Sequence, residues 1–93
     1  MDEIYSIFSL LFGITKNDLK KGIRKRDSRE ITDYRFLMCY FLYTKFHSRP
    51  TDIKIELGFK SHQSVYYAID YIAGLKESNR SIRNKVEILE FML

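Results

Sequence analysis

Eight apolar or aromatic residues follow one another without a break from Phe36 to Tyr43 (FLMCYFLY), and this run limits the folds open to the chain. On a helix, consecutive side chains point in all directions, so a run of this length indicates a segment that other elements surround. A membrane-spanning helix needs about 20 such residues, and the acidic start of the chain differs from the basic start of a secretory signal. We therefore predict the central helix of a water-soluble core, capped by Asp33 and running to about Phe46.

Helical spacing of apolar residues recurs on both sides of this run, without an alternating strand pattern or an internal repeat. Asp2 and Gly13 are the expected cap and stop of a first helix, and Thr15 or Asn17 begins a short second helix that ends at Gly22. The expected helices cover residues 4–12, part of 15–22, 33–46, 51–57, 62–75 and a last stretch from residue 81. Ninety-three residues make one domain, 1–93, so we predict an all-α fold, a compact bundle of about five to six helices.

The helices over 51–57 and 62–75 have well-marked ends. Pro50 and Thr51 open the first, Gly58 ends it, and Ser61 is the expected N-cap of the second. The side of the second helix that faces the core is predicted to carry Val65, Ala68, Ile69, Ile72 and Leu75, and its opposite side Gln63, Tyr66, Tyr67 and Asp70. The last helix is predicted to bury Ile82, Val86, Leu89 and Leu93.

Positive charge is concentrated in one segment. Residues 16–35 hold eight basic and four acidic side chains, which accounts for the whole net charge of +4, because the other eight basic and eight acidic residues cancel. Such a segment is typical of a protein with a polyanionic partner, although a solvated loop would look the same. A second basic cluster, at residues 76, 80, 83 and 85, is open to the same two interpretations.

Two short helices around a glycine turn are the pattern of a helix-turn-helix, in which the start of the second helix reads base edges in the major groove and the first helix crosses the backbone. The predicted base contacts are Ser61, His62, Gln63 and Ser64, whose donors and acceptors suit base edges. On the first helix, Thr51 and Lys54 are the predicted phosphate contacts. Two alternatives stay open: His62 could help Ser61 to cap the helix, and Tyr66 and Tyr67 could contact DNA or pack against neighbouring loops.

The stretch DIKIELGFKSHQSVYYAIDYI, residues 52–72, resembles the C-terminal DNA-binding domain of the bacterial replication initiator DnaA, and the likeness extends over roughly residues 4–90. Lys60 stands where the family has arginine, and Ser64 where it has threonine. The residues that agree directly are Ile53, Gly58, His62, Val65, Ala68 and Ile72. The chain departs from the family at the second turn glycine, at the aspartate before the histidine and at the threonine after it, where it has Phe59, Ser61 and Gln63.

The resemblance implies double-stranded DNA as the partner and a monomeric protein, with a replication protein as a further partner class. Arg35 and Lys60 would hold phosphates, and a basic loop would approach the minor groove through Arg24, Lys25, Arg26 or Arg29, with the choice between Arg26 and Arg29 left open. Because Ser61 and Gln63 replace two base-contacting residues of the family, a sequence preference other than its usual nine-base box is expected.

Several functions find no support in the sequence. The four glycines form no phosphate loop, the carboxylates are scattered, and the single cysteine permits neither an internal disulfide nor a cysteine zinc site. We therefore predict a protein that is not an enzyme, needs no cofactor or metal, and works in the reducing cytoplasm. A helical protein-interaction module whose basic loop binds an acidic partner is the alternative. Replication and transcription roles, and a free-standing chain or a piece of a longer initiator, stay open.

Overall fold

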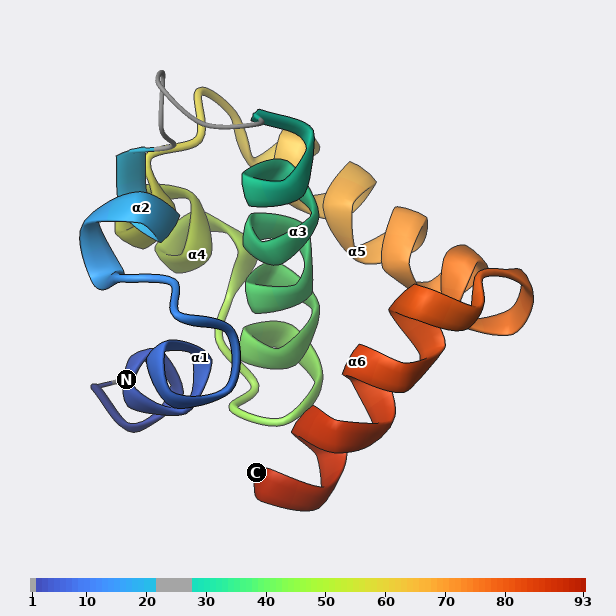
Figure 1. Cartoon of the computed structure of the whole chain (residues 1–93). Helices are drawn as coiled ribbons and strands as arrows, with labels where there is room; N and C mark the ends of the chain where they lie inside the picture. The colour runs from blue at the N-terminus through green and yellow to red at the C-terminus, as the bar shows by residue number, and fades with distance from the viewer. Residues whose placement is uncertain (1, 22–27) are drawn as a thin grey trace.

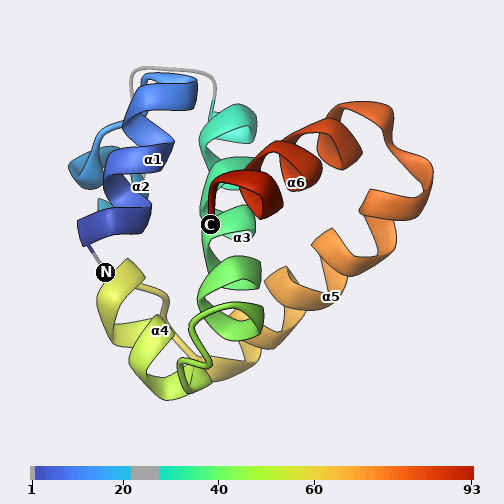
Figure 2. The ribbon, with the colours of Figure 1, turned by 90° about the horizontal axis from the view of Figure 1, so that it is seen from below.

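Helix α3 (Ser28–Thr44) lies at the centre of the computed structural model, which describes residues 2–21 and 28–93. Helices α1, α2 and α4 lie on one side of it and α5 and α6 on the other (Figures 1 and 2). Every residue from Leu37 to Leu42 is buried, as expected for a helix with neighbours on all sides. At the ends of the apolar run, Phe36 is partly buried and Tyr43 is 40% exposed.

Over these two ranges the chain forms six α-helices and no strand, which confirms the predicted all-α fold. The Cα radius of gyration is 12.0 Å, close to the value of about 12 Å that is typical of a compact domain of this length. Among the described helices, none is long and apolar enough to cross a membrane.

The predicted start of the central helix at Asp33 is wrong, because α3 begins five residues earlier, at Ser28. Ile31 and Tyr34 are buried, so the first turns of α3 extend the face that packs on the core, and Asp33 lies within the helix. Arg29 consequently belongs to α3 and not to the predicted basic loop. The other loop candidates, Arg24, Lys25 and Arg26, lie outside the described residues.

The first two helices follow the prediction closely. Helix α1 (Asp2–Phe12) starts at Asp2 itself, so that residue is the first of the helix and not its cap, and Gly13 ends it at φ 68°. Helix α2 (Lys16–Lys21) is capped by Thr15. The Thr15 hydroxyl accepts from the Asp18 amide at 3.2 Å, and the Asp18 carboxylate accepts from the Thr15 amide at 3.1 Å. This reciprocal pair satisfies two amides that the helix leaves open.

The remaining helices are α4 (Pro50–Leu57), α5 (His62–Ser78) and α6 (Arg80–Met92). The predicted core faces are confirmed, except that Leu75 and Leu93 at the helix ends are only partly buried. Asn79, which was not a predicted cap, caps α6 by accepting from the Ile82 amide at 3.0 Å. The helix therefore begins at Arg80, one residue before the predicted start at Ser81. The chain turns back sharply between α5 and α6, so these two helices form a V (Figure 2), and α5 packs against α3.

Candidate nucleic-acid interface

The connection between α4 and α5 consists of residues 58–61 and depends on Gly58. Gly58 has φ 71° and ψ 31°, a left-handed conformation that glycine adopts without steric cost. Its amide and that of Phe59 both donate to the Lys54 carbonyl, the latter at 3.0 Å. A Cβ at Gly58 would lie 2.8 Å from the backbone oxygen of Lys20, so the turn is also pressed against α2. Only glycine fits this position without movement of the backbone.

Arg35 ties the same turn to α2 and α3. Its Nε donates to the Leu19 carbonyl at 2.9 Å, one terminal nitrogen donates to the Leu57 carbonyl at 2.6 Å, and its guanidinium lies 4.4 Å from the centre of the Phe59 ring. Both carbonyls lie in the last turn of a helix, where no amide of the helix itself is left to donate to them. Burial lowers the pKa of the guanidinium from its ordinary value. Arg35 thus has a structural role that sequence reasoning missed, and its predicted phosphate contact stays a prediction.

The start of α5 separates the four predicted base-contacting residues into two pairs. Ser61 caps the helix, since its Oγ accepts from the Ser64 amide at 3.3 Å, and the two serine hydroxyls lie 3.3 Å apart. Both serines are partly buried, whereas His62 and Gln63 are exposed. His62 forms an edge contact with the Tyr66 ring at 6.4 Å. Ser61 thus provides the cap bond, and His62 and Gln63 are the exposed residues among the four.

The predicted phosphate-contacting residues differ in their exposure. Lys60 is exposed and directly precedes Ser61, and Thr51 is exposed in the first turn of α4. Lys54 is partly buried, and its carbonyl receives the two amides of the turn. Further along α5, Asp70 and Glu77 are exposed, and the negative charge of these carboxylates disfavours contact of a polyanion with the turns that carry them.

The second basic cluster is largely engaged within the protein. Arg83 donates to the carbonyls of Lys76 and Glu77, at 3.2 and 2.7 Å, and so satisfies the last turn of α5. Lys76 donates to the Tyr40 hydroxyl at 2.9 Å, and this hydrogen bond raises the pKa of the ammonium group. Lys85 donates to the Ser81 hydroxyl at 2.8 Å. These contacts give three of the four members of the cluster a structural role that the sequence did not reveal, whereas Arg80 is exposed.

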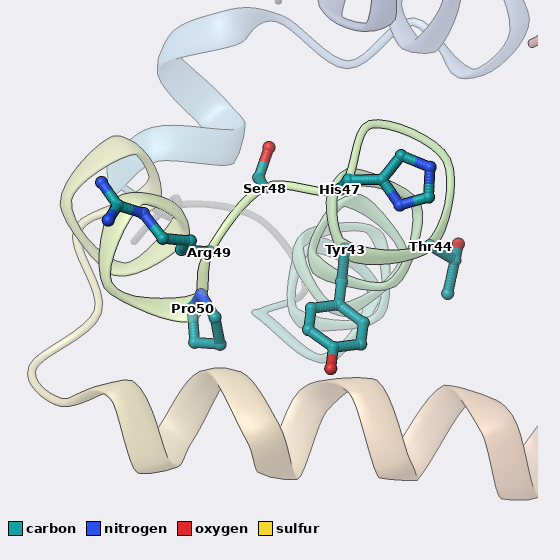
Figure 3. Close-up of a pocket in the computed structure, with 6 residues that line it drawn as sticks. All are labelled: Tyr43, Thr44, His47, Ser48, Arg49 and Pro50. Atoms are coloured by element: carbon teal, nitrogen blue, oxygen red, sulfur yellow. The ribbon is translucent and has the colours of Figure 1, made fainter.

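A hollow of about 500 Å³ lies at the corner between α3 and α4, as shown in Figure 3. It is lined by Tyr43, Thr44, His47, Ser48, Arg49 and Pro50. The side chains of Ser48, His47 and Arg49 point in different directions, and Arg49 pairs with Asp52 at 3.2 Å. His47 has φ 56° and turns the chain after α3. Because its polar groups do not converge, this corner is a weaker candidate site than the start of α5.

In the part of the chain that the structure describes, no three histidine, cysteine or acidic side chains come together in a group that could hold a metal ion. No family model, curated protein or solved structure matches the chain. The function is therefore inferred from the arrangement of residues around α4 and α5.

Proposed function

We propose that this protein binds double-stranded DNA with a sequence preference, using α4 and α5 as a helix-turn-helix, and that it acts in replication or transcription control without hydrolysing nucleotide. The observation that carries the proposal is the capped start of α5. Gly58 ends α4 just before this point, and Lys60, His62 and Gln63 are all exposed. Open amides at a helix start attract phosphate, and the groups at its mouth suit base edges.

The roles divide between backbone and bases. Lys60, Thr51 and the first amides of α5 would hold phosphates, with Lys54 at the edge of the contact. Gln63 would pair with an adenine through its two-ended amide, and His62 would donate to a base or phosphate beside it. Ser61 and Ser64 already form hydrogen bonds with each other, so only the remaining donors and acceptors of their hydroxyl groups would bond to a base.

The residues that match the DnaA domain and those that depart from it lie at different kinds of position. Ile53, Val65, Ala68 and Ile72 are buried, and Gly58 forms the turn, so these five agreements fall on the positions that shape the two helices. The departures Phe59, Ser61 and Gln63 fall in the connection and the first turn of α5. Under this proposal the chain would use the family's scaffold with a different reading surface, and we therefore expect a sequence preference other than the family's box.

The test is a titration of labelled duplexes, one carrying that box and others of selected or scrambled sequence, at several salt concentrations. Lys60→Ala should weaken binding to every duplex and reduce the magnitude of the salt slope by about one unit, because one phosphate contact is lost. Lys45→Ala is the matched control, since Lys45 is an exposed lysine just past the end of α3. It should leave both quantities unchanged.

Gln63→Ala separates reading of bases from holding of phosphates. The preference among duplexes should change by about 1 to 3 kcal/mol, with the salt slope unaffected. If Gln63→Ala weakens all duplexes equally, the assignment to bases is wrong. If the wild-type protein binds no duplex at low salt, the proposed function fails, and an acidic protein partner for the basic segment becomes the hypothesis to test.

A further inference from the structure

A second hollow, of about 380 Å³, lies beside the start of α5. We refer to it as the aromatic hollow, and it is lined by Phe36, Phe59, Ser61, Gln63, Ser64 and Tyr67. These residues come from α3, from the connection after α4 and from the first turns of α5. The hollow therefore opens directly next to the surface to which we assign DNA contact.

Aromatic rings gather around Phe36. Its ring centre lies 6.5 Å from that of Phe59, 6.0 Å from that of Tyr67 and 5.4 Å from that of Tyr71. Tyr67 and Tyr71 stack on each other with an angle of 26° between their planes. These tyrosines are not core residues, since 61% of Tyr67 and 37% of Tyr71 is exposed. The exposed ring of Tyr67 is supported by the rings of Phe36 and Tyr71. An exposed ring that other rings hold in place can serve as a platform on which a nucleobase stacks.

The rim of the hollow is polar and its flank is cationic. Three polar residues, Ser61, Gln63 and Ser64, line the hollow together with the rings, and the exposed Lys60 lies in the chain between Phe59 and Ser61. The Arg35 guanidinium packs on the Phe59 ring at 4.4 Å and donates to two backbone carbonyls, so it supports this ring and leaves the exposed Lys60 as the cation for a ligand. An aliphatic side chain of a partner protein would use the rings alone. A nucleotide would use all three features: its base would stack on the rings, its base edge would bond to the polar side chains, and its phosphate would meet the Lys60 ammonium group.

We infer that the aromatic hollow binds one unpaired nucleobase of a nucleic-acid strand by stacking on Tyr67. The inference rests on the proposed function in so far as nucleic acid must reach the start of α5. It adds a second substrate class, strands or duplex sites with an unpaired base, to the paired DNA proposed above. Because every base has a flat face, the site should be tolerant of base identity.

The experiment compares two fluorescent single strands of equal length, oligothymidylate and the corresponding abasic strand, at low salt. Both carry the same phosphates, so their affinity ratio isolates the contribution of the bases. Wild-type protein should bind oligothymidylate at least about fivefold more tightly, the lower limit expected for one stacked base. Tyr67→Leu should abolish that ratio, and Tyr67→Phe should retain it because the ring is kept.

Tyr43→Leu is the matched control, because Tyr43 is an exposed tyrosine at the end of α3 that does not line the aromatic hollow. Its variant should keep the wild-type ratio, and circular dichroism should show all variants folded. Equal affinity for the two strands overturns the inference, and a ratio that survives Tyr67→Leu also overturns it, because the bases would then bind elsewhere than on Tyr67.

A paired duplex titrated in parallel distinguishes this inference from the proposed function. Duplex binding without a base-dependent ratio leaves the proposed function standing and removes the stacking site. A base-dependent ratio without duplex binding does the reverse. Absence of binding to strands and duplex removes both.

Discussion

Replacement of Gly58 by alanine should destabilise the protein by about 2 to 4 kcal/mol. At φ 71° a side chain costs roughly 1 to 2 kcal/mol, and the reduced freedom of the unfolded chain offsets about 0.4 to 1 kcal/mol of this. The larger contribution comes from space. The new Cβ would lie 2.8 Å from the Lys20 backbone oxygen, and overpacking of this kind costs about 1 to 3 kcal/mol.

Two other glycines separate these contributions. Gly13 has φ 68°, but no atom lies within 4 Å of the position that a Cβ would take there, so Gly13→Ala should show the backbone cost alone, about 1 kcal/mol. Gly74 lies inside α5 with open space around it, and Gly74→Ala should stabilise the protein by up to about 1 kcal/mol, since alanine favours the helix. The three variants should therefore rank in the order Gly74→Ala, Gly13→Ala, Gly58→Ala from most to least stable.

Urea unfolding followed by far-ultraviolet circular dichroism measures these differences, provided that the dependence of the unfolding free energy on urea is the same in all variants. In thermal unfolding, each kcal/mol corresponds to about 4 to 8 °C in Tm for a domain of this size. Equal losses for Gly13→Ala and Gly58→Ala would refute the reasoning, because they would show that the Lys20 carbonyl moves away from the turn at no cost.

Buried or partly buried groups supply three more predictions. Arg35→Met should lower the free energy of unfolding by about 1.5 to 3 kcal/mol, because two helix-end carbonyls lose a charged donor. The control Lys60→Met should change it by less than about 0.5 kcal/mol in the same urea assay. Equal effects would contradict the structural role of Arg35. Burial, followed by the 2.6 Å hydrogen bond to Glu56, raises the pKa of Tyr5, so its contribution to stability is complete below about pH 10 and is lost at higher pH as the unfolded chain ionises first. The stability difference between wild type and Tyr5→Phe, measured from about pH 8 to about pH 11, should consequently shrink as the pH rises, and a difference that stays constant would speak against this linkage. Burial raises the pKa of the Cys39 thiol to about 12, so an aromatic disulfide reagent at neutral pH should modify the folded protein only at the rate of its opening, and rapid labelling of the native protein would be the contrary result.

The local parts of the fold are open to prediction from sequence because their signals lie within a few residues. The Ser61 cap, the Gly58 stop and the buried side of α5 each follow from neighbouring residues and a period of 3.6. The predicted start of α3 fails because its signal is not local. A run of charges there looks like a loop, and only the burial of Ile31 and Tyr34 against other helices shows that these residues continue the helix.

Local patterns in the chain were thus enough to establish the helical class, the central position of the apolar run and the exposed side of α5 that includes Gln63. Helix packing, and no local pattern, decides that Arg35 bonds to the ends of two helices and that Phe36 meets Tyr67 to build the aromatic hollow. The physical reason is distance along the chain. A cap or a helical face depends on residues within one or two turns, whereas these contacts join segments 16 or more residues apart, whose meeting is set by how the helices pack.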